Sequence, residues 1–217
     1  MQFSDYWNNV HSERFDKEIV YDNWLDKYKL VWESSKTPIL DLGCGAGNDT
    51  LYFVEKGYSV VACDYSEVAL EKIRKNIESA QTKLVDISQP LPFKDNSFDV
   101  VVADLSLHYF DEKTTKTIIE EINRILTPNG SLLARVNSVA DINHGAGQGE
   151  KIEENFYFVE GYNKRFFTIE DARIFFSIIG DVRIIEADML RYTKPKKVIE
   201  VVATKVDKKV FSAVDRV

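Results

Sequence analysis

Residues 38–47 read Pro-Ile-Leu-Asp-Leu-Gly-Cys-Gly-Ala-Gly, a short apolar run that ends in an acid and passes into a glycine-rich loop. The next segment, 48–57, has apolar residues at helical spacing, so the loop joins a strand to a helix. Glycines let the backbone turn tightly and let a ligand approach the main chain without meeting a Cβ atom. We therefore expect a ligand-binding loop at the end of the first strand.

The rest of the chain alternates short apolar runs with helical segments. Apolar runs lie at 59–65, 82–87, 98–105 and 131–136. A helical pattern at 66–80 lies between the first two runs, and another at 118–126 lies between the last two. This alternation predicts parallel strands joined by right-handed crossovers. A capped helix at 168–180 follows, and then a terminal antiparallel hairpin of 182–190 and 197–205.

Length and composition fit one domain over residues 1–217. The chain is 44% hydrophobic, which is enough to bury a full core. Residues 1–36 are polar and rich in aromatic residues, and we expect them to form an N-terminal helical cap. The glycine-rich segment 138–166 has no clean period, and we expect it to be an insertion that shapes specificity.

Charge and composition argue against several classes of partner. The net charge of −7 gives no attraction toward nucleic acid or anionic lipid, so a small molecule is the expected partner. No run of about 18 apolar residues and no signal-peptide pattern is visible, and we expect a cytoplasmic protein. Cys44 and Cys63 lie in apolar segments without metal-type spacing, so we expect reduced thiols and no metal.

Acids mark the ends of the first three predicted strands. Asp41 would repel a pyrophosphate and attract a cation, and Asn48 stands where a dinucleotide fingerprint needs its third glycine. Asp64 comes 17 residues after Gly47, near the spacing at which a carboxylate binds ribose hydroxyls, and Asp86 can reach an adenine amino group. Open α/β sheets bind ligands at this edge, so the pattern predicts a positively charged nucleoside.

At these residues the chain resembles the class I S-adenosylmethionine-dependent methyltransferase family, in particular its small-molecule branch. The matching motifs are Asp41–Gly47, the strand that ends in Asp64, Asp86 with Ile87, and the blocks at 91–110 and 126–133. The resemblance implies an α/β fold with a doubly wound, seven-stranded, mostly parallel Rossmann-like sheet. It also implies S-adenosylmethionine as cofactor, S-adenosylhomocysteine as product, and in-line methyl transfer to a small molecule.

The resemblance also assigns a set of site residues. The predicted cofactor-binding residues are Asp41, Gly43, Cys44, Gly45, Asp64, Tyr65, Asp86, Ile87, Asp104 and Leu105. Asp104 and Leu105 are expected to close over the methionine end, and Tyr6 and Trp7 to cover the pocket. Residues 103–106 lack the Pro-Pro-aromatic motif of amino-directed nucleic-acid enzymes, which argues against base methylation.

The sequence gives fewer signals for the residues that bind the methyl acceptor. The predicted catalytic residues are His108, Tyr109 and His144, which would orient or deprotonate an oxygen, nitrogen or sulfur atom, although His108 can equally pack under the cap. Two alternatives stay open, an NAD(P)-dependent oxidoreductase on a related sheet and a non-catalytic module that only binds the adenosyl ligand. Monomer and homodimer are both compatible with the sequence.

Overall fold

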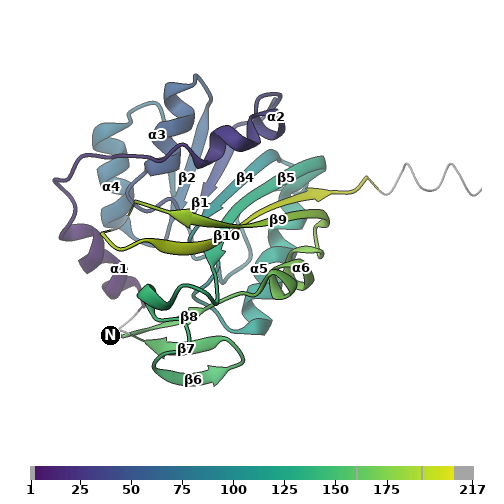
Figure 1. The fold of residues 1–217 in the computed structure, drawn as a ribbon. Coiled ribbons are helices and arrows are strands. Elements are labelled where there is room, and N and C mark those ends of the chain that lie inside the picture. The colour runs from purple at the N-terminus through teal and green to yellow at the C-terminus, as the bar shows by residue number, and fades with distance from the viewer. Residues whose placement is uncertain (1–2, 160, 192, 208–217) are drawn as a thin grey trace, which may run out of the picture.

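A seven-stranded sheet with helices on both faces runs through the molecule (Figure 1). The structure is a computed structural model, and it describes residues 3–159, 161–191 and 193–207. The strands, in spatial order, are β3 (Gln81–Leu84), β2 (Val60–Asp64), β1 (Ile39–Leu42), β4 (Phe98–Asp104), β5 (Leu126–Asn137), β10 (Lys196–Lys205) and β9 (Gly180–Met189). The first five pair in parallel and β10 is antiparallel to both neighbours, so the predicted fold is confirmed.

Helices connect these strands as the sequence predicts. They are α1 (Phe3–Ser12), η1 (Trp24–Tyr28), α2 (Lys29–Trp32), α3 (Asn48–Glu55), α4 (Glu67–Asn76), α5 (Glu112–Ile125), η2 (Ile142–His144) and α6 (Ile169–Phe176). Ser66 begins α4 by accepting a hydrogen bond from the Ala69 amide at 3.2 Å. Thr168 and Asp171 begin α6 with a reciprocal capping box.

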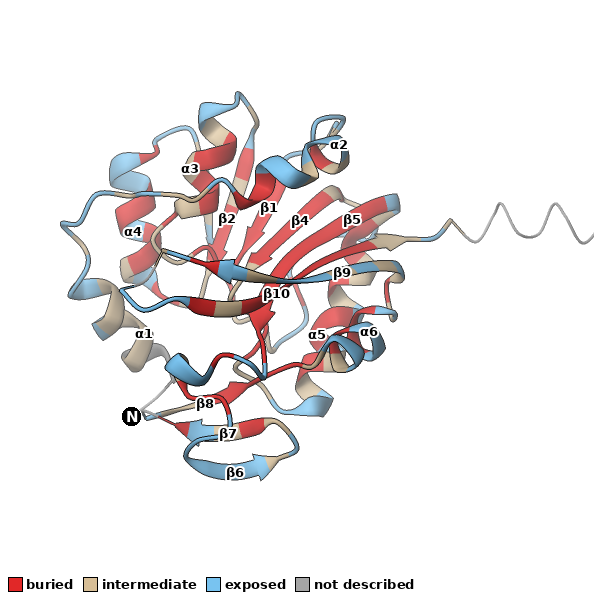
Figure 2. Ribbon diagram, viewed as in Figure 1, coloured by how far each residue is buried: buried red, intermediate tan, exposed pale blue. Residues whose placement is uncertain are grey.

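Two hydrophobic layers hold the sheet between its helices. Val101 and Ala103 of β4 belong to the layer that packs on α5 and α6, whereas Val100 and Val102 belong to the layer under η1, α2 and α3. Successive residues of a strand point to opposite faces, which explains why an unbroken apolar run is needed here. Figure 2 shows the same pattern, with buried strands between helices that are exposed on their outer sides.

Three parts of the prediction differ from the structure. The segment 138–166 contains a second, antiparallel sheet of β6 (Glu150–Glu153), β7 (Phe156–Val159) and β8 (Tyr162–Arg165), which the sequence pattern did not indicate. The N-terminal cap is helical only at α1, η1 and α2, and residues 13–23 between them are not helical. The edge strand β3 is shorter than predicted, so Asp86 lies two residues beyond its end.

Candidate active site

A cavity of about 220 Å³ lies at the carboxyl ends of β1, β2 and β4. Its wall includes every predicted cofactor-binding residue, namely Asp41, Gly43, Cys44, Gly45, Asp64, Tyr65, Asp86, Ile87, Asp104 and Leu105. The strand order places β1 between β2 and β4, so three parallel strands deliver their last residues to one place. The structure thus brings the residues together, and their role in binding stays a prediction.

The glycine loop after β1 is shaped by close packing and by an unusual backbone. Gly43, Gly45 and Gly47 have φ values of 79°, 50° and 90°, a region that favours glycine. A Cβ atom on Gly43 would come within 2.3 Å of the Ser106 side chain, which follows β4. The Ser106 hydroxyl donates to the Leu42 carbonyl at 2.7 Å. Gly43 is therefore required by the approach of the chain after β4 to the end of β1.

Asp64 holds the glycine loop against the start of α4. Its Oδ2 accepts a hydrogen bond from the Gly45 amide at 2.8 Å, and its Oδ1 accepts one from the Ser66 amide at 2.9 Å. Each carboxylate oxygen has a second lone pair, so both can accept a further bond from a ligand hydroxyl. Asp64 thus combines a structural role in the loop with a position in the cavity wall.

Two buried acids lie on the β1 and α3 side of the cavity. Asp41 accepts a hydrogen bond from the Thr50 hydroxyl at 2.6 Å, and burial raises its pKa to about 7. Asp49 accepts a bond from the Trp24 indole at 3.1 Å, and burial raises its pKa well above the usual value. A positively charged ligand would favour the ionised form of both acids.

Asp104 at the end of β4 is held by two arginines, and the sequence did not predict this pairing. Arg135 donates from Nε and Nη2 to its two oxygens at 2.6 and 2.7 Å, and Arg191 donates from Nη2. Arg135 also donates to Asp22 at 2.9 Å. Burial raises the pKa of Asp104, but the two guanidinium groups outweigh it and lower the pKa to about 2. Asp104 therefore stays ionised.

Leu105, the next residue, has a strained backbone. Its φ is 56°, in a region that a branched aliphatic residue rarely adopts. Its amide donates to the Arg135 carbonyl at 2.9 Å, which holds the conformation. Strain of this kind persists where the surrounding structure imposes it, often at functional sites. Its place in the cavity wall fits that pattern.

Helix α1 covers one side of the cavity. Trp7, Val10 and His11 lie in the wall, so the expected cover by Trp7 has a structural basis. Ser66 donates from its hydroxyl to Asn8 at 2.7 Å, which attaches α1 to the start of α4. Burial lowers the pKa of His11, although the nearby charge of Asp64 raises it.

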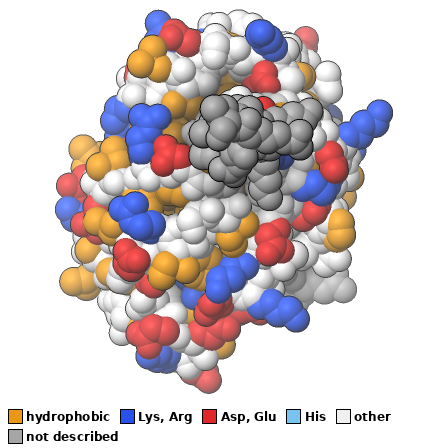
Figure 3. Space-filling model, turned by 90° about the vertical axis from the view of Figure 1, so that its right-hand side faces the viewer, with side chains coloured by type: hydrophobic (Ala, Val, Ile, Leu, Met, Phe, Trp, Pro, Cys, Tyr) orange, Lys and Arg blue, Asp and Glu red, His pale blue; other side chains and the backbone are white. Residues whose placement is uncertain are grey.

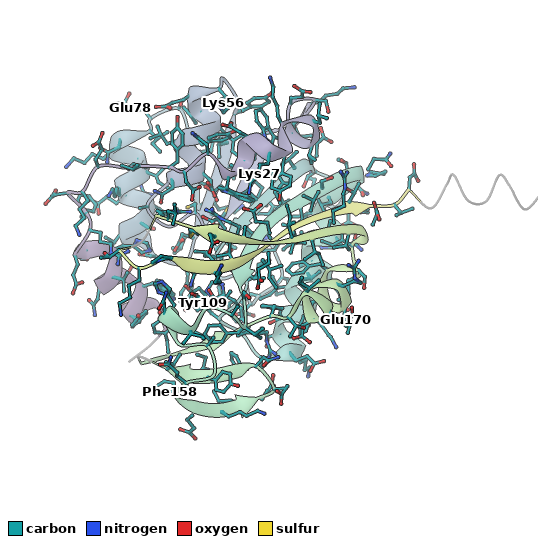
Figure 4. The ribbon with its side chains drawn as sticks, in the orientation of Figure 1. Lys27, Lys56, Glu78, Tyr109, Phe158 and Glu170 are labelled. Atoms are coloured by element: carbon teal, nitrogen blue, oxygen red, sulfur yellow. The ribbon has the colours of Figure 1, made fainter. Side chains whose placement is uncertain are left out.

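The predicted catalytic residues occupy different positions. Tyr109, which is labelled in Figure 4, lies in the wall. Its ring contacts Trp7 of α1 and Tyr162 of β8, with centroids 4.9 and 5.8 Å away. His108 is buried behind it at a ring distance of 4.3 Å, and its Nδ1 has no hydrogen-bond partner in the described part of the chain. His144 is outside the wall, with its Nε2 3.3 Å from the Lys194 carbonyl.

His108 is buried and lies near two lysines. Burial, and then the positive charges of Lys196 and Lys164, lower its pKa well below the usual value. The imidazole is therefore neutral at physiological pH and retains a nitrogen lone pair.

Neither a metal site nor a membrane span is found in the described residues. Over 3–159, 161–191 and 193–207, no three His, Cys, Asp or Glu side chains are placed to hold a metal ion. In the same part of the chain no helix is long and apolar enough to cross a bilayer.

Comparison with known proteins identifies the fold. Residues 39–130 match the sequence model of a family described as "Methyltransferase domain". The tRNA N(3)-methylcytidine methyltransferase Mettl2 of Drosophila melanogaster is 28% identical over 190 residues, which are 79% of this chain and 58% of that protein. The chain spans about half the length of the curated relatives it matches.

Several solved structures have a similar fold. A SAM-dependent methyltransferase of Methanosarcina mazei has a TM-score of 0.70 at 23% identity and covers 85% of this chain and 99% of its own. The 1,6-didemethyltoxoflavin-N1-methyltransferase of Burkholderia thailandensis, solved with its acceptor and S-adenosylhomocysteine, has a TM-score of 0.60 at 19% identity, over 94% and 90% of the two chains.

The sheet order, the loop after β1 and these matches define a class I, Rossmann-like methyltransferase fold. Residues 39–130 thus carry the sequence pattern of a methyltransferase domain, and solved structures of the same fold include proteins described as S-adenosylmethionine-dependent methyltransferases.

Proposed function

We propose that this chain transfers the methyl group of S-adenosylmethionine to a small molecule. The observation that carries the proposal is that Asp41 and Asp64, at the ends of β1 and β2, and Asp86, in the loop after β3, line one cavity. Acids gathered in this way suit a ligand that carries positive charge beside a nucleoside. They do not suit the pyrophosphate of NAD, because its charge would be repelled.

The two ends of the cavity fit the two ends of this cofactor. Asp64, Asp86 and Ile87 would hold the ribose and the adenine. Asp41 and Asp104, with the amides of the loop after β1, would hold the methionine end. The raised pKa of Asp41 supports this orientation, since the ammonium and sulfonium groups would draw the carboxyl into its ionised form.

The protein's main contribution to catalysis would be orientation. The sulfonium of the bound cofactor supplies a strongly electrophilic methyl group, which is transferred by in-line displacement. Orientation can contribute about 7 to 11 kcal/mol, against about 3 to 5 kcal/mol from a general base at 10² to 10⁴-fold. Tyr109, in the wall, would contact the acceptor. His108 would support Tyr109 or accept a proton, and His144 would act from the insertion.

The group of aromatic rings beside Tyr109 suits a small acceptor better than a nucleic acid. Tyr6 and Trp7 of α1 and Tyr162 of the insertion pack together beside Tyr109, with ring centroids 5.0 to 6.1 Å apart. We infer that the insertion at 138–166 shapes the acceptor site through these rings. The side of the molecule away from α1, which Figure 3 shows, carries basic side chains interspersed with acidic ones and no broad positive patch for a phosphate backbone.

Transfer of labelled methyl groups tests this proposal. The protein is incubated with S-adenosylmethionine carrying a labelled methyl group and either a small-molecule metabolite extract or total tRNA. Label in a small molecule supports the proposal. Label in tRNA alone would contradict it and would make tRNA the acceptor, as the name of the Mettl2 relative states for that protein.

Titration with S-adenosylhomocysteine and NADH separates a methyltransferase from an oxidoreductase and from a binding module. A methyltransferase should bind S-adenosylhomocysteine and also transfer label. Binding of NADH alone would indicate an oxidoreductase, and adenosyl binding without any transfer would indicate a binding module.

A further inference from the structure

Arg191 brings a positive charge to a cavity whose other charged groups are mostly acids. It lies in the turn between β9 and β10, and its side chain is 21% exposed. Both ends of this turn lie at the ligand-binding edge of the sheet, because β9 ends there and β10 begins there. The C-terminal hairpin thus reaches the same cavity as the strand ends of β1 and β4.

The guanidinium of Arg191 is only partly engaged. Its Nη2 donates to Asp104, and its Nε is 3.6 Å from Asp22 without a hydrogen-bond partner in the described part of the chain. Its Nη1 bonds to no described residue. Arg135 differs, because all three of its nitrogens are bonded and its guanidinium stacks 4.5 Å from the Trp24 ring. Arg191 therefore lies in the cavity wall with donors left for a ligand, whereas Arg135 is not part of that wall.

The charges next to Arg191 match one chemical group. Asp104, Asp49 and Asp41 lie in the same part of the wall, so the site presents acids beside one base. An α-amino acid needs this arrangement, because its ammonium and carboxylate sit on one carbon. The other arginine in the wall, Arg14, lies instead beside His11, close to Asp64 at the nucleoside end.

We propose that Arg191 binds the α-carboxylate of the methionine moiety while the neighbouring acids bind its ammonium group. This inference rests on the proposed function, since it names a contact to the cofactor of that reaction. A guanidinium presents two parallel N–H groups to a carboxylate, which gives direction as well as charge. The C-terminal hairpin would then be part of the cofactor site and not only an edge of the sheet.

A pair of ligands isolates this contact. S-adenosylhomocysteine carries the amino-acid group, and 5′-methylthioadenosine keeps the nucleoside and sulfur but lacks it. By titration calorimetry, Arg191→Gln should weaken S-adenosylhomocysteine binding by roughly 10- to 100-fold, as expected for a charge-assisted hydrogen bond, and leave 5′-methylthioadenosine within about twofold. Arg191→Lys should bind S-adenosylhomocysteine with an affinity between those of the unaltered protein and Arg191→Gln. Arg183→Gln, an exposed change on β9, should alter neither affinity.

The possible outcomes separate the interpretations. Equal weakening of both ligands in Arg191→Gln would mean that Arg191 acts through the shape of the cavity, and would overturn the proposal. Unchanged binding of S-adenosylhomocysteine would also overturn the proposal. If the same variant then failed to transfer label into the metabolite extract, Arg191 would instead bind a group of the methyl acceptor. If the unaltered protein bound neither ligand, the proposed function would be wrong and this inference with it.

Discussion

Replacing Asp104 by Asn tests the buried charge network beneath the cavity. The side chains of Asp104 and Arg135 are 8% and 2% exposed, so the pair has little access to water. Removing one partner of a buried ion pair costs about 3 to 5 kcal/mol, because the other charge stays buried. We expect about 3 kcal/mol for Asp104→Asn, since Asn keeps an acceptor oxygen and Arg135 keeps its bond to Asp22 at 2.9 Å.

Urea unfolding followed by circular dichroism measures this loss. A loss of about 3 kcal/mol corresponds to a fall of about 6 to 12 °C in the melting temperature of a protein of this size. Asp95→Asn is the matched control, because Asp95 is 69% exposed, pairs with Arg124, and should change stability by less than about 1 kcal/mol. If Asp104→Asn unfolded at the same urea concentration as Asp95→Asn, the account of this network would be refuted.

The same network predicts a pH dependence of stability. The folded-state pKa of Asp104 is about 2, below the unfolded value of about 4. Its contribution to stability is therefore complete above pH 4 and is lost as the pH falls toward 2. Over that range the unfolding free energy should decline less steeply in Asp104→Asn than in the unaltered protein.

Three further variants test individual site residues. Asp64→Ala should weaken S-adenosylhomocysteine binding by at most about 3 kcal/mol through lost charged hydrogen bonds, and unchanged affinity in calorimetry would remove Asp64 from the site. Because the pKa of Asp41 is raised to about 7, affinity for the cationic S-adenosylmethionine should increase as the pH rises through 7, and Asp41→Asn should abolish that increase. His108→Ala should reduce turnover more than cofactor affinity, and equal turnover would leave His108 a packing role.

Much of the fold follows from local sequence pattern. The run at 98–105 predicts a strand buried on both faces, and β4 ends at Asp104, within one residue of the prediction. Ser66 and Thr168 mark helix starts because their side chains satisfy amides that the first turn leaves unpaired. The small sheet β6–β8 could not be predicted from local pattern, because its four-residue strands are too short to show a clear period.

The candidate site, like the fold, could be predicted only in part from the sequence. Asp41, Asp64 and Asp104 are visible as acids at the ends of apolar runs, and the rule for parallel sheets brings them together. The pairing of Asp104 with Arg135 and Arg191 is not visible, because these arginines meet Asp104 across 31 and 87 residues of chain. Side-chain pairing over such distances depends on the order of strands in the sheet, and here β10 lies between β5 and β9. No periodicity in the sequence reports that order.

The most direct measurement is a crystal structure of the protein with S-adenosylhomocysteine. We expect the ribose hydroxyls to bind Asp64, the adenine to bind Asp86 and the Ile87 amide, and the amino-acid group to lie beside Asp104 and Arg191. A ligand bound in the reverse direction, or one bound away from the glycine loop after β1, would contradict this expectation.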